Sequence, residues 1–267
     1  MSYAISPNLD AILSSAGDDA ARVLPHFALV DAGQLLHLKL PMDRLLPMAA
    51  TELLFEESFA KSALHLSPAL LQLNTSRPVC TDEIRILDRA CESLPVLTLL
   101  RSDHSLKDLA AHLRSALLIE AEESAYLFRF ADSQMMAAMN TVLTPSQRGC
   151  LFAGIDGWWS IDHWGRLDNG ADQTRYPQAV PPSAFPLQLD AAQTDRLLTA
   201  VAVPVFASQL RNLDPSFARI HNHAQQTAFA AECIAAGNAA GVDADSDLTS
   251  FALQRWNDRL DALTVAA

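Results

Sequence analysis

The sequence predicts an α/β amino-terminal lobe, with a mostly parallel sheet flanked by helices and a short antiparallel edge, followed by an all-α carboxy-terminal lobe. From about residue 26 to 152, short apolar runs alternate with longer amphipathic ones, which is typical of strands followed by helices. Four prolines then fall within residues 171–186, where the apolar residues have no period. Beyond them, apolar residues recur at helical spacing. We therefore predict an α/β domain over 1–170, a connector over 171–186 and a helical lobe over 187–267.

The individual elements follow from the length and spacing of the apolar runs. Short runs bounded by turn residues predict strands at 26–32, 68–73, 95–102 and 125–134. Apolar residues three and four positions apart predict helices at 45–58, 82–93, 105–120 and 133–143. Turn formers predict short antiparallel strands over 154–170. In the second lobe we predict helices at about 190–211, with Pro204 as a kink, 216–236 and 246–264.

Composition argues against several classes of function. Lys and Arg total 19 against 31 Asp and Glu, so the formal charge of −12 opposes binding to a phosphate backbone. No apolar run reaches the about 20 residues of a membrane span, and the amino terminus lacks a basic segment followed by an apolar core. The four cysteines form no CxxC pair. We expect a soluble cytoplasmic protein that binds neither nucleic acid nor membrane.

One stretch raises a specific question about function. The segment "AYLFRFADSQ" at 125–134 has the pattern of a buried strand, yet it carries Arg129 in its middle and Asp132 near its end. A charged pair in such a place belongs either to an active site or to the scaffold. In the scaffold, the guanidinium of Arg129 would make charge-assisted hydrogen bonds to Asp132, Asp31 or carbonyl groups at strand ends.

Three predicted strands are followed by an acidic residue, namely Asp31, Asp103 and Asp132. The carboxyl ends of strands in an open α/β sheet are where ligands usually bind, so these carboxylates could hold Mg²⁺ or act as acid and base. The alternative is that Asp103 and Asp132 begin helices, where a side-chain oxygen accepts hydrogen bonds from free amide groups. Helix starts use Asp far more often than catalysis does, which favours the capping interpretation.

Motifs for catalysis, nucleotides and metals are missing. The sequence contains no G-x-G-x-x-G, no G-x-x-x-x-G-K-[ST] and no G-x-S-x-G. His221 and His223 are two apart, and on a helix such residues point away from each other and cannot share an ion. His112 lies among Leu and Ala on a predicted helix, which favours a packing or capping role. We expect no cofactor, no metal and no catalytic residue.

Candidate partner-binding residues are aromatic. Trp158, Trp159 and Trp164 lie close together in the chain, and Trp is enriched at the centres of protein interfaces. Their alternative role is to close one end of the core. Phe229 lies in "AFAAECIAAGNAAG" at 228–241, whose small residues would let a partner helix approach closely.

Several segments occur in the order and approximate spacing of one known family. They are "FALVDA", "SPALLQL", "LLRSDHSLKDLAAHLRSALLIE" and "YLFRFADSQMMAAMNTVLTPSQRGCLFAGIDGWW", and together they cover about residues 26–165. The most specific parts are "HLR" at 112–114 and "FRFAD" at 128–132. In these respects the chain resembles the adaptor and chaperone family that loads toxic effectors onto the spike of the type VI secretion system. The family motif falls on Asp31, His112, Arg114, Arg129 and Asp132.

The resemblance implies a non-enzymatic protein of the bacterial cytoplasm. Its partners would be a secreted effector, bound through an amino-terminal or amphipathic apolar segment, and a VgrG-type spike protein that receives this effector. The alternative from another class is a small α/β enzyme that uses Asp31, Asp103 and Arg129 on an anionic or metal-bound substrate.

Overall fold

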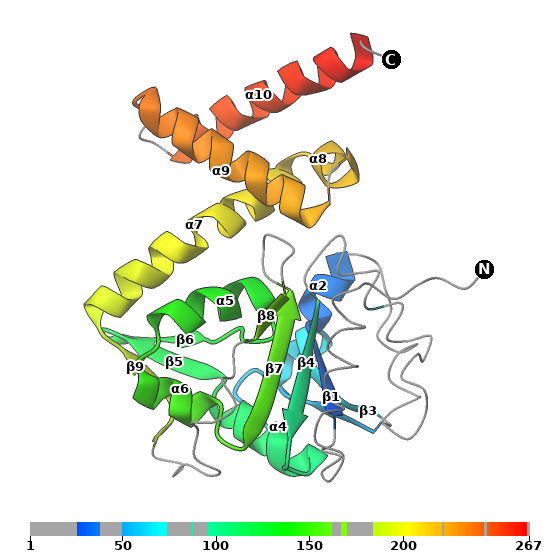
Figure 1. Cartoon of the computed structure of the whole chain (residues 1–267), viewed down its shortest axis with the longest axis vertical. Helices are drawn as coiled ribbons and strands as arrows, with labels where there is room; N and C mark the ends of the chain where they lie inside the picture. The colour runs from blue at the N-terminus through cyan, green and yellow to red at the C-terminus, as the bar shows by residue number, and fades with distance from the viewer. Residues whose placement is uncertain are drawn as a thin grey trace, which may run out of the picture. The chain divides into compact units, whose positions relative to one another are not determined.

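The structure is a computed structural model, and it describes residues 26–37, 50–73, 87, 96–161, 167–169, 184–220, 222–242 and 245–265. The chain divides into two compact units, and the division falls after Leu197. The first unit contains the strands, and the second contains the last three helices (Figure 1). Helix α7 (Ala191–Leu213) begins in the first unit and continues in the second.

A large sheet in the first unit is antiparallel throughout the described strands, so the prediction of a mostly parallel sheet is wrong. Its strands, in spatial order, are β2 (Thr51–Leu53), β3 (Ala69–Leu73), β1 (His26–Val30), β4 (Leu97–Ser102), β7 (Ile155–Ile161) and β8 (Leu167–Asn169). Each neighbouring pair runs in opposite directions.

Burial on both faces gives these antiparallel strands the apolar runs that are typical of parallel strands. Phe27, Ala28, Leu29 and Val30 of β1 alternate between the two faces, and all four are fully buried. A strand covered on both sides has a continuous apolar run whichever way its neighbours point, and such runs are typical of parallel sheets. The pattern therefore indicated burial correctly but carried no information about strand direction.

A predicted helix is also replaced by a strand. Over residues 50–58, the described part of the helix predicted at 45–58, the chain forms β2 and then a series of turns up to the short 3₁₀ helix η3 (Lys61–Leu66). Leu54 and Phe55 lie in these turns and are buried in the main core, so apolar residues in this segment reflect packing of a loop rather than one face of a helix. Without a crossover helix here, β2 returns antiparallel to β3.

A second, smaller sheet contains β6 (Ser124–Leu127), β5 (Leu118–Ala121) and β9 (Leu187–Leu189), in that spatial order. Strand β6 pairs antiparallel with β5, whereas β9 pairs parallel with it. The strand predicted over 125–134 therefore ends at Leu127, and Arg129 lies in the turn that follows. The helix predicted over 105–120 ends at Ser115, because the chain turns there to enter β5.

Helices of the first unit begin at capping side chains. Helix α2 (Ala32–His37) follows β1 directly, and α4 (Leu106–Ser115) begins after Ser105, which accepts a hydrogen bond from the Asp108 backbone amide. The sequence also has the spacing of a capping box here, with Ser105 three residues before Asp108. Helix α5 (Ser133–Val142) follows Asp132, and α6 (Pro145–Leu151) begins with a capping box at Thr144.

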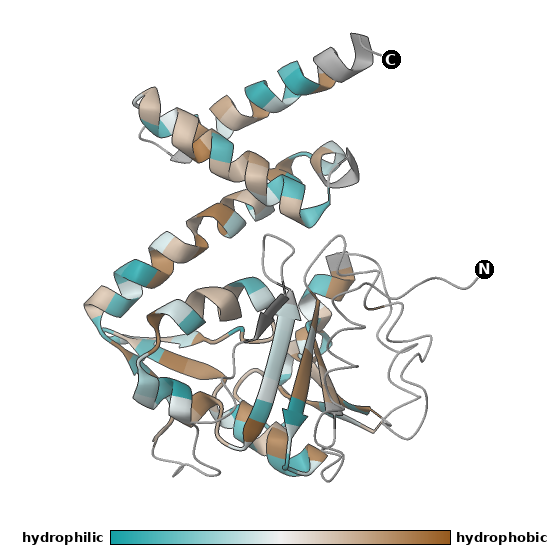
Figure 2. Cartoon of the chain, viewed as in Figure 1, coloured by the Kyte–Doolittle hydropathy of each residue, from teal (hydrophilic) through white to brown (hydrophobic). Residues whose placement is uncertain are grey.

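The main core fills the space between one face of the large sheet, the smaller sheet and these helices. The strands contribute Phe27, Leu29, Leu100 and Trp158, and the helices contribute residues such as Leu109, Leu113, Met136, Met139 and Leu151. Phe128 and Phe130 enter the core from the turn after β6, and Phe130 packs edge-on against Trp158. Figure 2 shows β5 and most of β4 in the brown of hydrophobic residues.

The second unit is helical, as predicted, and is built on an aromatic cluster. Helix α8 (Pro215–Ile220), α9 (His223–Ala239) and α10 (Asp245–Val265) surround Phe217, Phe229 and Trp256, whose ring centroids lie 5.1 to 5.7 Å apart. The helix predicted over 216–236 is thus two helices, because Asn222 forms a capping box that starts α9. Burial raises the pKa of the Cys233 thiol in this core to about 11.

Some predictions concern residues outside the described ranges. These are Trp164, His221, residues 45–49 of the helix predicted at 45–58, residues 162–166 and 170 of the strands predicted over 154–170, the connector residues 171–183, and the helix at 82–93 apart from Leu87, which is helical and buried. Within the described ranges, no helix has both the length and the apolar character needed to cross a membrane.

Gly154 provides a test of packing where α6 leads into β7. Its φ of +68° lies in the left-handed region, and a Cβ at this position would lie 2.1 Å from Nε2 of His104. Gly241 has a similar φ of +70° but has open space around its Cβ position. We expect Gly241→Ala to cost about 1 kcal/mol of unfolding free energy from backbone strain alone. Gly154→Ala should cost clearly more, because it also displaces His104, and equal costs in urea denaturation would contradict this packing.

Candidate functional site

Arg129 sits over two carboxylates at one end of the large sheet. One of its terminal nitrogens lies 3.3 Å from Oδ2 of Asp31 and 3.6 Å from Oδ2 of Asp132. The Arg129 side chain is 50% exposed, whereas those of Asp31 and Asp132 are 6% and 13% exposed. The guanidinium therefore covers two acidic groups that are themselves largely removed from water.

The local structure explains why both acids lie here. Asp31 directly precedes α2, and its Oδ1 accepts a hydrogen bond from the backbone nitrogen of Gln34 at 3.1 Å. Asp132 precedes α5 and accepts a hydrogen bond from the Gln134 amide nitrogen at 3.0 Å. Each acid thus acts at the start of a helix, which confirms the capping prediction for Asp132 and gives Asp31 the same role. The Gln34 side chain connects the two by donating to Asp132 at 3.4 Å.

The electrostatic environment of Asp132 is unfavourable for a charged carboxylate. Burial raises its pKa above the ordinary value, the Arg129 charge opposes this shift, and the nearby Asp31 adds to it. Two acids therefore share one cation in a poorly hydrated place. The Asp31–Arg129–Asp132 cluster fastens the end of β1 and the start of α2 to the start of α5, which is a scaffold role for the arginine in the turn.

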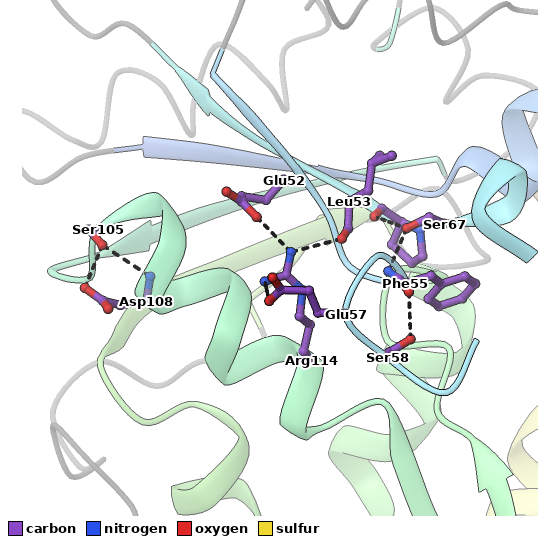
Figure 3. Close-up of polar contacts among 10 residues, drawn as sticks. Glu52, Leu53, Phe55, Glu57, Ser58, Ser67, Ser105, Asp108 and Arg114 are labelled. Carbon is purple, nitrogen blue, oxygen red and sulfur yellow. Dashed lines mark hydrogen bonds and ion pairs between the residues drawn. The ribbon is translucent and has the colours of Figure 1, made fainter. Parts of the chain in front are cut away.

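Arg114 makes a second internal connection. It extends from the last turn of α4 toward β2 and the turns that follow it, as Figure 3 shows. It donates to Oε2 of Glu52 at 2.7 Å and to the Leu53 carbonyl at 3.1 Å, and it lies 3.4 Å from Oε2 of Glu57. The arginine side chain is only 12% exposed. These contacts attach α4 to the strand at the edge of the large sheet.

His112 is held inside the first unit as well. Its Nε2 lies 2.8 Å from the carbonyl of Leu151, so this nitrogen donates the hydrogen bond. Its ring stacks on that of His104 at 6.2 Å and meets Phe185 edge-on at 5.7 Å. Burial lowers the pKa of His112, and the neighbouring His104 lowers it further, while the bond to Leu151 opposes the shift.

The strand-end acids do not all come together, because the sheet is antiparallel. His26 pairs with Arg101 and Val30 pairs with Leu97, so the last residues of β1 and β4 lie at opposite ends of this strand pair. Asp31 follows β1 and donates from its amide to the Val96 carbonyl, whereas the exposed Asp103 follows β4 at the other end. The length of the strand pair, roughly 17 Å at about 3.4 Å per residue, separates them.

Asp103 also differs from the capping prediction, since Ser105 is the residue that caps α4. The enzyme hypothesis required Asp31 and Asp103 around one substrate. In the described structure these two residues have no common site.

The described aromatic candidates are buried. Trp158 is 0% exposed, Trp159 is 8% exposed and Phe229 is 4% exposed. Trp158 and Phe229 belong to the cores of the first and second units, and Trp159 lies over Gly157 with Arg101 stacked on its ring at 5.4 Å. In this structure they close cores, and they offer little side-chain surface to a partner.

Sequence reasoning missed Gln34, Glu52 and His104. Gln34 lies three residues after Asp31. The side chain of a helix cap usually bonds the backbone amide three residues later, so the contact between Asp31 and Gln34 could have been predicted if Asp31 had been taken as a cap. No signal pointed to Glu52, because 45–58 was predicted to be a helix. His104 lies before α4 and His112 lies within it, and no sequence pattern indicated that their rings would stack.

Part of the chain matches a known protein family. Residues 26–150 match the model of a protein family described as a domain of unknown function, DUF4123. The match covers just under half of the chain and includes Asp31, His112, Arg114, Arg129 and Asp132. No curated protein and no solved structure matches the chain.

The buried acids make the effect of Arg129 dependent on pH. At pH 7, Arg129→Ala leaves two buried carboxylates without their cation, and we expect a loss of about 2 kcal/mol, less than for a fully buried pair because the arginine is half exposed. Since the pKa of Asp132 is raised, its stabilising contribution is present at low pH and is lost as the pH rises through that pKa. Removal of the opposing arginine raises this pKa further, so the deficit should shrink between pH 7 and pH 4 in urea denaturation.

Arg259→Ala is a matched control for this variant. Arg259 is also 50% exposed, but its partner Glu232 lies 4.0 Å away and is 62% exposed, and its other contact, with the Phe229 ring at 5.9 Å, involves no titratable group. We expect a small effect with little dependence on pH. Adding Asp132→Asn to Arg129→Ala should restore part of the stability at pH 7, because Asn caps a helix without a charge. A deficit that is independent of pH and unaffected by Asp132→Asn would contradict the electrostatic account.

His112 should produce a separate pH effect near neutrality. Because its folded-state pKa is lowered, its contribution to stability is present above about pH 6.5 and is lost as the pH falls below that value. We expect the His104→Gln variant to lose less stability than the native chain between pH 8 and pH 5.5, because the substitution removes a neighbour that lowers the pKa of His112. The urea midpoint measured across this range is the test, and a steeper loss in His104→Gln would contradict it.

Proposed function

We propose that this protein is a non-enzymatic adaptor or chaperone that binds a type VI secretion effector in the bacterial cytoplasm and passes it to a VgrG-type spike protein. The proposal is supported by the resemblance described above, whose motifs lie over about residues 26–165. The match to the domain of unknown function covers residues 26–150, largely the same part of the chain.

One observation carries the proposal: the charged motif residues are used inside the fold. Arg129 binds two helix-capping acids, Arg114 binds Glu52 and a strand carbonyl, and His112 binds a helix-end carbonyl. A motif with these contacts maintains a shape. Such a motif suits a protein that presents a surface to partners better than one that needs the same groups for a reaction.

The helical unit adds a candidate surface for the effector. Leu198, Val205 and Leu213 of α7 are 62%, 48% and 59% exposed. Their spacings of seven and eight residues place them on the same side of one helix. An exposed apolar row of this kind can pack against an apolar amphipathic segment of another protein by the helix-in-groove mode.

The direct test is co-expression of the full chain with the effector encoded by a neighbouring gene and with its spike protein. We expect the effector and this chain to co-purify at roughly 1:1, and effector secretion to stop when the gene for this chain is deleted. If the effector is secreted normally without this chain, the proposal fails.

A double variant distinguishes an adaptor from an enzyme. The double change Asp31→Asn and Asp132→Asn keeps the size of both side chains and their capping oxygens while it removes two carboxylates. An adaptor carrying this change should still deliver its effector, provided that its melting temperature is retained. Lost delivery by a folded double variant that still binds the effector would favour catalysis at these acids.

A further inference from the structure

Strand β6 forms an open edge of the smaller sheet. The described strands of that sheet have the order β6, β5, β9, so one side of β6 pairs with β5 and the other has no neighbouring strand within it (Figure 1). All four residues, Ser124 to Leu127, are exposed. Tyr126 and Leu127 are 53% and 39% exposed, which is unusual for large apolar side chains on neighbouring positions.

The hairpin geometry shows which main-chain groups point toward this edge. In an antiparallel pair, residues alternate between those that bond across the pair and those that point away from it. A two-residue turn makes Ala121 and Ser124 a bonded pair, and the bond from the Phe128 amide to the Leu117 carbonyl agrees with this alternation. The amide and carbonyl groups of Ala125 and Leu127 therefore point outward. They form a template for another strand.

Charge around the edge indicates what kind of strand would fit. The turn before β6 consists of Glu122 and Glu123, both exposed. Glu122 has a φ of +56°, a left-handed conformation that Gly or Asn adopts more readily. The segment from 118 to 127 contains no Lys or Arg. An added strand would therefore place two carboxylates beside one of its ends.

We propose that β6 is a docking edge at which an extended segment of the effector adds as a further strand. Tyr126 and Leu127 point to opposite faces of β6, so a segment with alternating apolar residues would pack these residues on one of the two side chains. It would carry Lys or Arg at the end beside Glu122 and Glu123. This inference rests on the proposed function, because the effector supplies the segment. Main-chain hydrogen bonds provide the affinity in this mode of binding, and the side chains and charges provide the selectivity.

A second copy of this chain fits the edge less well. Two four-residue strands paired edge to edge bury little surface, whereas a stable interface buries about 1,200 Å² or more. An effector segment can continue past the turn and gain further contacts, which an identical short hairpin cannot do.

The key variant is Ala125→Pro in the full chain. Proline at this position removes an outward amide but no hydrogen bond to β5, so the hairpin should remain intact. In the effector co-purification described above, we expect Ala125→Pro to retain at least fivefold less effector than the native chain, with an unchanged melting temperature. A second measurement uses two synthetic eight-residue peptides that alternate Thr and Val and end in either two Lys or two Glu residues. The native chain should bind the Lys peptide at least tenfold more tightly in fluorescence anisotropy.

Charge variants provide a measurement that does not depend on proline. Glu122→Lys with Glu123→Lys should abolish the preference for the Lys peptide. The control combines Glu56→Lys with Asp258→Lys, which are exposed positions elsewhere and change the net charge equally, and it should keep the preference.

The outcomes separate this inference from the proposed function. If the native chain retains no effector, the proposed function fails. If the native chain and Ala125→Pro retain the effector equally, only the docking edge is wrong. Dimerisation of the native chain in analytical ultracentrifugation that Ala125→Pro abolishes would show that a second copy occupies the edge, and it would overturn the inference.

Discussion

The first unit depends on one arrangement of charges, in which Arg129 covers the buried carboxylates of Asp31 and Asp132. Each acid accepts a hydrogen bond from the first turn of a helix, so the cluster connects the end of β1 and the start of α2 with the start of α5. Helix starts need an acceptor, and an acid there also interacts favourably with the helix dipole. Two such acids side by side repel each other, and the arginine reduces that repulsion. A helix-capping requirement at two places in the chain thus creates the need for a cation between them.

The direction of the strands decides what the strand-end acids can do. In a parallel sheet, Asp31 and Asp103 would both follow strands at the same edge and could share a ligand. In the antiparallel pair of β1 and β4, each strand ends beside the start of the other, so these acids lie at opposite ends. Asp132 takes the place beside Asp31 because the turn after β6 brings it there. The chemistry that a set of acids can perform is therefore a property of topology rather than of the acids themselves.

The motif residues and the exposed residues have different roles. His112 and Arg114 of α4 and Arg129 of the turn after β6 are used within the first unit, where they bind a helix end, an edge strand and two helix starts. By contrast, the exposed side chains of Tyr126 and Leu127 lie on β6, which is at the edge of the smaller sheet as far as its strands are described. A fixed scaffold with exposed apolar edges is the physical arrangement that binding proteins use, because the rigid part lowers the entropy cost of holding the contact surface in place.

The amino-acid sequence by itself determined where the chain is buried, where several helices begin and which part is helical. The apolar runs of β1, β3 and β4, the caps at Ser105 and Asp132 and the helices after residue 190 are local properties, since each depends on residues within a few positions of one another. Only the tertiary structure decided the strand directions, the strand at 51–53, the separation of Asp31 from Asp103 and the burial of Trp158 and Trp159. These features depend on residues far apart in the chain. A strand buried on both faces has the same apolar pattern in either direction, and an aromatic side chain has the same identity in a core as at an interface.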